Sequence, residues 1–121
     1  MNPVPKLQFA RERRLTLSSE FARVKATGKT ERGPLLILGV LETNDQSPCR
    51  AGFVTSKRIG EAVIRNRVRR RLREIVRRHQ HEIRVGIWLV CVARPPAAKA
   101  TYARLEDEWL RLAKRAFILA P

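Results

Sequence analysis

Acidic residues, cysteines and long apolar runs are all scarce in this sequence. Eleven Asp and Glu residues stand against twenty-six Lys and Arg residues, which leaves a formal net charge of +15. The two cysteines, Cys49 and Cys91, lie far apart without CxxC spacing, which is typical of buried or incidental thiols in a reducing cytosol. No apolar run approaches the ~20 residues that a transmembrane helix needs. Met1 to Ala10 holds no sustained apolar stretch, so we expect no signal peptide. We therefore expect a cytoplasmic protein.

The motifs of common enzyme classes are missing as well. The sequence has no G-x-S-x-G nucleophile elbow and no glycine-rich phosphate loop. His79 and His81 form a His-x-His pair, but no third ligand lies at a spacing typical of zinc sites. The acids at 106–108 are adjacent, so on a helix they point in different directions. We therefore expect no catalytic residue, no metal and no cofactor bound by the protein alone.

Positive charge is the strongest signal that is present. Between Arg50 and Arg84 twelve Lys and Arg residues face three Glu residues, a local charge of +9. So much like charge in a small fold is self-repulsive, and a polyanion relieves that repulsion. Nucleic acid is the simplest such partner, because phosphate contacts release counterions. With 121 residues, 44% of them hydrophobic, the chain predicts one nucleic-acid-binding domain over 1–121, in which residues 1–14 form a loose arm.

The hydrophobic pattern predicts an α+β fold. A short helix is expected over 18–27, strands over 35–41, 51–55 and 86–93, and longer helices over 65–78 and after Thr101. The first two long strands are joined by a turn at 44–48, and we expect them to pair antiparallel; the strand at 86–93 is expected at the centre of the sheet. The prediction is a single-domain sandwich: a mixed β-sheet packed against helices in the order α-β-β-α-β-α, with room for one further short strand.

The helix over 65–78 carries eight arginines in fourteen residues. Its apolar residues fall on one helical stripe that can be buried: Val68, Leu72, Ile75 and Val76. The opposite sector, within about 60°, predicts an exposed ridge of Asn66, Arg70, Arg73 and Arg77. Glu74 is the only acid in the segment, so a salt-bridged solvent face is a poor explanation. Because guanidinium groups bind phosphate oxygens in pairs, we expect this ridge to contact phosphates.

Two further cations precede this helix. Lys57 and Arg58 lie between the second strand and the helix, and Gly60 permits a sharp turn after them. The free N–H groups of a helix N-terminus also favour an anion. We therefore add Lys57 and Arg58 to the predicted RNA-binding residues.

The block from Thr55 to Glu74, TSKRIGEAVIRNRVRRRLRE, resembles the signature of the bacterial ribonuclease P protein family. The segment from Arg14 to Gly28 is similar to the family's N-terminal helix, and 92–95 resembles the end of its last long strand. The resemblance implies a subunit that binds a catalytic RNA and the 5′ leader of precursor tRNA, and assists endonucleolytic removal of that leader. It implies RNA contacts by Arg65, Asn66, Arg67, Arg69, Arg70 and Arg73. Mg²⁺ would then be bound by the RNA, and no protein or membrane partner is implied.

The resemblance also implies a cleft for the single-stranded leader, with Phe21 on its wall. Stacking of a base on an aromatic ring explains a phenylalanine there, although Phe21 also fits plain core packing. Lys25 stands where the family commonly has a second phenylalanine. Lys25 therefore predicts more phosphate attraction and less stacking in this chain.

Three other functions fit parts of the pattern. A ribosomal protein or an RNA chaperone would carry the same charge without any effect on precursor-tRNA cleavage. A DNA-binding helix would need varied base-reading side chains on its ridge, and only Asn66 interrupts the arginines. A membrane-surface helix would have the charged face, but the apolar stripe has no Trp or Phe.

Overall fold

The computed structural model describes residues 14–15 and 18–120. The helices are α1 (Ser18–Thr27), α2 (Ala62–His79) and α3 (Tyr102–Arg115), and the strands are β1 (Lys29–Arg32), β2 (Leu36–Glu42), β3 (Arg50–Val54) and β4 (Ile87–Ala93). Short 3-10 helices lie at η2 (Lys57–Ile59), η3 (Gln80–Glu82) and η4 (Pro95–Lys99). The predicted α+β class is confirmed, and β1 is the further short strand. Apart from Arg14, the predicted loose arm lies outside the described residues.

The four strands form one mixed sheet in the order β1-β2-β4-β3. Strand β4 is central, as predicted, and it pairs antiparallel with β2 and parallel with β3. The predicted pairing of β2 with β3 is therefore wrong. The physical reason is the crossover through α2: a strand, a helix and a second strand place the two strands side by side and parallel. Strand β4 thus fills the position next to β2.

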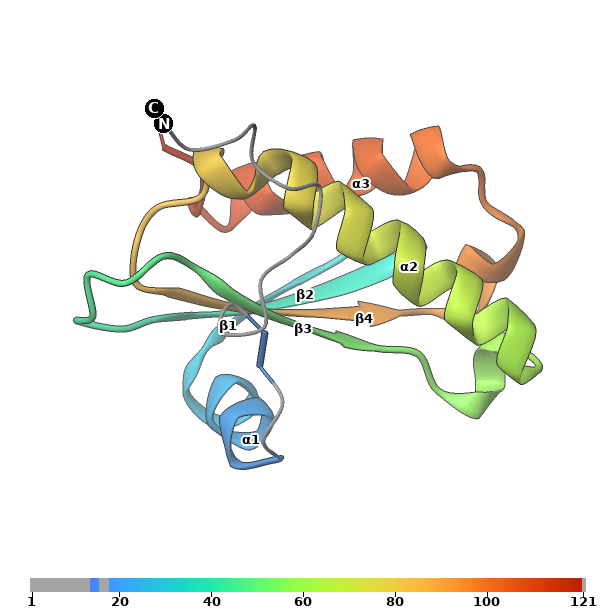
Figure 1. The fold of residues 1–121 in the computed structure, drawn as a ribbon, viewed down its shortest axis with the longest axis horizontal. Coiled ribbons are helices and arrows are strands. Elements are labelled where there is room, and N and C mark those ends of the chain that lie inside the picture. Colours follow the sequence, from blue (N-terminus) through green and yellow to red (C-terminus); the bar gives the residue numbers. More distant parts are fainter. Residues whose placement is uncertain (1–13, 16–17, 121) are drawn as a thin grey trace, which may run out of the picture.

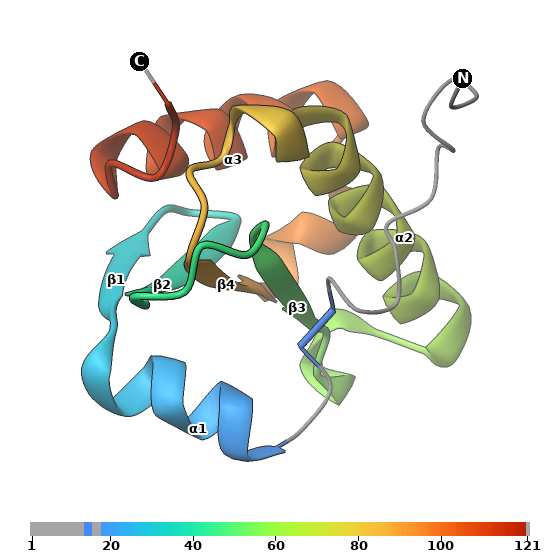
Figure 2. The same cartoon turned by 60° about the vertical axis from the view of Figure 1, so that its left-hand side comes forward.

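Helices α2 and α3 cover one face of the sheet, and α1 lies on the other (Figures 1 and 2). The predicted stripe of α2 is confirmed, since Val68, Leu72, Ile75 and Val76 are each 0% exposed. The apolar residues of α3 lie in the same core, together with the residue that ends the helix: Leu105, Trp109, Leu112 and the C-cap Ala116. The Thr101 hydroxyl accepts a hydrogen bond from the Arg104 N–H at 3.2 Å and so caps α3. Cys49 and Cys91 are buried thiols that lie outside any disulfide, and burial raises the pKa of Cys91 to about 12.

A buried carboxylate ties α3 to the start of β2. Glu108 is 2% exposed, and its Oε2 accepts hydrogen bonds from the Leu35 N–H at 2.7 Å and the Leu36 N–H at 2.6 Å. Gly33 leaves room for this contact, because a Cβ there would lie 2.5 Å from Oε2. Glu108 therefore satisfies two backbone donors where the turn after β1 leads into β2.

Helix α1 crosses its face of the sheet over a row of residues that includes two glycines. Gly39, Val90 and Gly52 are register neighbours on β2, β4 and β3. A Cβ at Gly52 would lie 2.5 Å from the Phe21 ring, and one at Gly39 would lie 3.3 Å from Val24. The two glycines thus allow the helix to approach the sheet closely.

This crossing divides the α1 face of the sheet into two flanks. The next row on one side, here called the Trp88 flank, consists of Leu41, Trp88 and Arg50; the row on the other side, the Val92 flank, consists of Ile37, Val92 and Val54. Glu20 of α1 pairs with Arg50 at 2.5 Å, and the Arg23 guanidinium lies 5.1 Å from the Trp88 ring centroid. These contacts turn one side of α1 toward the Trp88 flank. The opposite side of the helix, with Phe21 and Lys25, therefore faces the Val92 flank.

Candidate nucleic-acid interface

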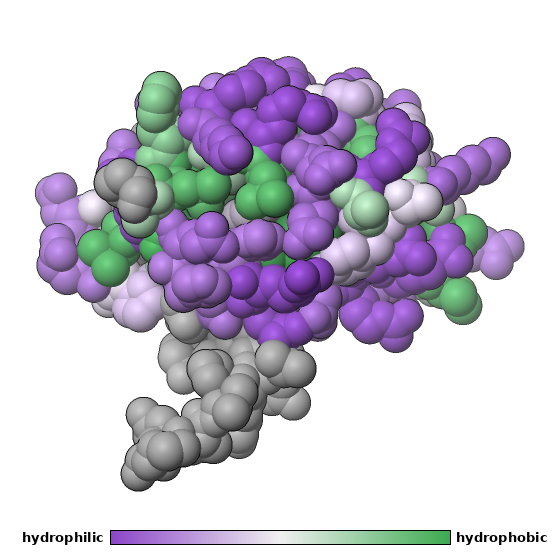
Figure 3. All heavy atoms as spheres, turned by 90° about the horizontal axis from the view of Figure 1, so that it is seen from above, coloured by the Kyte–Doolittle hydropathy of each residue, from purple (hydrophilic) through white to green (hydrophobic). Residues whose placement is uncertain are grey.

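The arginine-rich side of α2 faces away from the sheet. Figure 3 looks down on α2 and α3 and shows hydrophilic side chains over most of this surface. Asn66 and Arg70 are exposed, as predicted for the ridge, and Arg73 is half-buried. Arg77 departs from the prediction, because it is buried, at 9% exposed. Its guanidinium pairs with Glu74, the only acid of the segment, and this pairing makes the burial tolerable.

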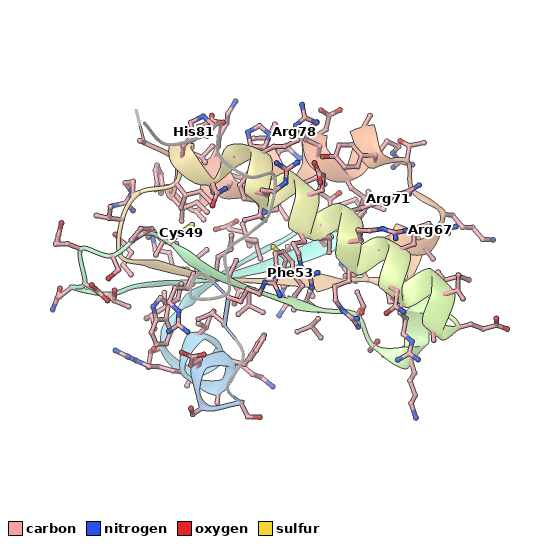
Figure 4. All side chains as sticks on the ribbon, viewed as in Figure 1. Cys49, Phe53, Arg67, Arg71, Arg78 and His81 are labelled. Carbon is pink, nitrogen blue, oxygen red and sulfur yellow. The ribbon has the colours of Figure 1, made fainter. Side chains whose placement is uncertain are left out.

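Several α2 arginines are oriented by neutral acceptors. Arg67 donates to the Ala98 carbonyl at 3.2 Å, and Arg71 donates to the Ala100 carbonyl at 3.1 Å. Both side chains extend from α2 toward the segment that leads into α3 (Figure 4). Arg69 donates to the Thr55 hydroxyl at 2.6 Å. These bonds fix the side chains without neutralising them, and each guanidinium has five N–H donors in total. The positive charge therefore remains available to an anion.

Arg73 belongs to a cluster of like charge at the β3 edge of the sheet. Its guanidinium carbon lies 6.0 Å from the centroid of the Phe53 ring, which sits below α2 (Figure 4). Burial lowers the pKa of Arg73, and the positive charges of Arg14 and Arg69 lower it further. The lowered pKa means that burial and the two neighbouring positive charges disfavour the charged form of Arg73. The negative charge of a bound phosphate would favour the charged form again. Sequence reasoning missed Phe53 and Arg14, because only the fold brings them next to α2.

Lys57 and Arg58 are exposed on η2, which is anchored by the buried Ile59. Gly60 follows with φ of +147°, a backbone conformation that L side chains rarely adopt. Among the described residues no side chain caps the N-terminus of α2, where Glu61 occupies the cap position. The two cations therefore stand beside backbone N–H groups that are open to an anion.

An open pocket of about 530 Å³ lies at the end of the Val92 flank. Ile37 and Val92 form an apolar part of its wall, and Arg58 and Arg94 place two positive charges in its lining. Arg94 is exposed and donates to the Gly33 carbonyl at 2.9 Å, which holds it at the rim. The complete lining is Pro34, Ile37, Ser56, Arg58, Val92, Ala93, Arg94, Pro95 and Pro96. No sequence motif could reveal this pocket, because three separate chain segments form it.

The two predicted cleft residues lie on the side of α1 that faces the Val92 flank. Phe21 is half-buried and packs over Gly52, so it takes part in the smaller core on this face of the sheet. Lys25 is exposed one helical turn later. The sheet thus offers an apolar surface with a partly open aromatic ring and a lysine on one rim. Arg58 and Arg94 stand at its far end.

Within the described part of the chain, no group of three or more His, Cys, Asp and Glu could hold a metal ion. His79 bonds to Glu82 at 2.7 Å and to Glu106 at 2.9 Å, and its ring stacks on Trp109. Burial opposes protonation of His79, but the two carboxylates outweigh burial and raise its pKa above 6.5. No helix among the described residues is long and apolar enough to span a bilayer.

Comparison with protein families and curated relatives gives one consistent result. A family model described as Ribonuclease P matches residues 9–117. A ribonuclease P protein component from Gluconacetobacter diazotrophicus is 38% identical over 107 residues, which cover 88% of this chain and 92% of the relative. One from Beutenbergia cavernae is 41% identical over 95 residues, which cover 78% of this chain and 80% of the relative.

Solved structures share the fold. The ribonuclease P protein of Staphylococcus aureus superposes with a TM-score of 0.82 at 23% identity, over 88% of this chain and 97% of that structure. The protein of Thermotoga maritima, in complex with 1-(4-fluorophenyl)-2-thiourea, gives a TM-score of 0.76 at 25% identity, over 84% of this chain and 97% of that structure.

Proposed function

The chain belongs to the ribonuclease P protein family, and from this membership we propose how its surface contacts RNA. Members of the family are the protein component of the ribonuclease P endoribonuclease, which acts with an RNA subunit in tRNA 5′ processing. The alternative of a ribosomal protein or RNA chaperone is not favoured by these relatives.

The observation that carries the proposal is the set of α2 guanidiniums held by neutral acceptors. Among the α2 arginines that the sequence predicts to bind RNA, only Arg77 pairs with a carboxylate in the described structure. We assign the exposed side of α2 and the turn before it to the phosphates of the catalytic RNA and of tRNA near the cleavage site. The proposed contacts are Lys57, Arg58, Arg65, Asn66, Arg67, Arg69, Arg70 and Arg73. Arg77 contributes only if RNA binding uncovers it.

The 5′ leader of precursor tRNA is assigned to the Val92 flank and its pocket. A single strand needs a surface for bases and cations for phosphates. Phe21 supplies a partly open ring, and Ile37, Val92 and Val54 supply half-buried apolar surface. Lys25 and Arg58 stand at opposite ends of this surface, where they would contact leader phosphates. With one aromatic residue on α1, leader binding depends more on phosphate than on base stacking.

The hydrolytic chemistry is assigned to the RNA subunit. We expect Mg²⁺ to be held by RNA oxygens, where it supplies an activated water and stabilises the leaving group. The protein's own residues position the single strand and screen phosphate repulsion. We further propose that the chain is one RNA-binding domain that works in the cytoplasm.

Affinity as a function of leader length tests this assignment. The complex of protein and RNA subunit is titrated with precursor tRNAs whose leaders grow one nucleotide at a time, at two salt concentrations. Affinity should rise until the Val92 flank is filled, and the gain should shrink at the higher salt because phosphate contacts are screened. An affinity that does not depend on leader length would refute the leader assignment and leave the α2 assignment standing.

A further inference from the structure

Phe117 is an exposed aromatic residue at the end of α3. Its exposed fraction is 70%, against 51% for Val85, which follows Arg84 in the sequence. Arg84 links the two, since its Nε donates to the Phe117 carbonyl at 2.9 Å. Single exposed apolar residues are ordinary. Phe117 differs because its backbone conformation is one that a phenylalanine rarely adopts.

The backbone at Phe117 forms a helix-ending motif that favours glycine. Phe117 has φ of +59°, and it is the only non-glycine residue with positive φ in the described structure. The Ile118 N–H bonds to the Ala113 carbonyl at 3.3 Å, and the Phe117 N–H bonds to the Lys114 carbonyl at 3.1 Å. This is the Schellman arrangement, in which glycine is the usual residue at this position. A bulky side chain here adds strain that its slight burial does not offset.

The ring has a cationic environment. The Lys29 ammonium of β1 lies 5.5 Å from the Phe117 ring centroid. An open pocket of about 700 Å³ adjoins the ring and contains Lys114 and Arg84 in its wall. In the described part of the chain no carboxylate pairs with Lys29 or Lys114.

The acidic side chains near the ring already form ion pairs within the protein. Glu42 pairs with Arg84 at 2.9 Å, and Glu82 pairs with His79 at 2.7 Å. Glu31 of β1 pairs with Arg115 at 3.0 Å. The side chains left for a ligand are therefore an aromatic ring and two lysines. This combination suits a base and its flanking phosphates better than an acidic or apolar partner.

We propose that Phe117 is a stacking platform for an unpaired nucleobase of RNA, with Lys29 and Lys114 binding the adjacent phosphates. The proposal rests on the RNA-binding function above, but it adds a second contact surface. Lys29 belongs to β1, at one edge of the sheet, whereas the cluster around Arg73 lies at the β3 edge. The two surfaces would therefore engage separate parts of the RNA.

The test separates binding from stability. Phe117→Asn removes the ring but keeps a residue that tolerates positive φ, whereas Phe117→Trp keeps an aromatic ring. Val85→Asn is the matched control, because it removes an exposed apolar side chain nearby that cannot stack. Kd is measured for the ribonuclease P RNA and, with the assembled holoenzyme, for precursor tRNA, which shows which RNA supplies the base.

Phe117→Asn should weaken binding to one of the two RNAs by about 5-fold or more, the loss expected for one stacked base. Its Tm should equal or exceed that of the wild type, because strain is relieved. Phe117→Trp and Val85→Asn should bind like the wild type, and Lys29→Ala should lose affinity only at low salt. If Phe117→Asn and Val85→Asn lost the same RNA affinity, the surface would bind through general apolar contact and not through base stacking. That result would overturn the proposal.

Two further outcomes would also overturn it. Phe117→Asn could bind both RNAs like the wild type, or its Tm could fall by several degrees, which would show that the ring serves packing. Arg70→Ala is measured in parallel. If it weakens RNA binding while Phe117→Asn does not, the second surface is absent and the proposed function stands.

Discussion

Two residues on α2, Arg70 and Leu72, should respond to alanine substitution in opposite ways. Leu72 is 0% exposed in the core between α2 and the sheet. Its truncation should cost roughly 2–5 kcal/mol of the free energy of unfolding, for the lost transfer energy and the cavity. For a domain of this size ~1 kcal/mol corresponds to roughly 4 °C in Tm, so Leu72→Ala should lower Tm by about 8–20 °C. Its RNA affinity should be unchanged at temperatures where it is folded.

Arg70→Ala should leave the fold intact and weaken RNA binding. Arg70 is exposed, so its loss should change the free energy of unfolding by less than about 0.5 kcal/mol. With about six phosphate contacts on α2, the slope of log K against log salt should be about −4 to −5 for the wild type. Removing one contact should reduce that slope by roughly 1.

Thermal unfolding and RNA titrations at several salt concentrations measure both effects, and Arg70→Lys is the control that keeps the charge. The orientation of α2 would be refuted if Leu72→Ala kept the wild-type Tm. The assignment of Arg70 to an RNA phosphate would be refuted if Arg70→Ala bound RNA with an unchanged salt slope.

Four other substitutions have outcomes that the structure predicts. Glu108→Gln removes the negative charge of the carboxylate that accepts hydrogen bonds from two backbone N–H groups. It should lower the free energy of unfolding by about 1–3 kcal/mol in a denaturant titration, whereas an unchanged midpoint would contradict that role. The raised pKa of His79 means that its stabilisation is complete below pH 6.5 and is lost as pH rises through the folded-state pKa. Wild-type Tm should therefore fall over that range, and His79→Gln should remove this fall; identical pH profiles would refute the linkage. Phe21→Ala should reduce affinity for precursor tRNA more than for mature tRNA, and Lys25→Ala should do so only at low salt; equal losses for both RNAs would argue that Phe21 is plain core.

Helical periodicity and composition predicted the parts of the fold that depend on local sequence. The stripe from Val68 to Val76 and the stripe around Trp109 are buried as expected, since amphipathic helices bury their apolar face. Which strands lie next to each other was harder to predict from the sequence. The short connection from β2 to β3 suggested a hairpin, but β4, about 30 residues later, takes the place between them.

The candidate interface was predictable only where one helix carries it. The exposed positions of Asn66 and Arg70 follow from helix geometry alone. The burial of Arg77 depends on its pairing with Glu74 and on tertiary packing, which a helical projection cannot show. The pocket with Arg94 and the cluster of Arg73 with Phe53 likewise arise only when distant segments meet.

Cleavage of a precursor tRNA by the ribonuclease P RNA, with and without this protein, tests the central claim most directly. The assay is run at limiting Mg²⁺, where phosphate repulsion between the two RNAs is strongest and added cationic surface has most effect. The account predicts faster release of the 5′ leader when the wild-type protein is present, with the cleavage site unchanged and with a smaller gain for Arg70→Ala. Equal cleavage rates with and without the wild-type protein would contradict it.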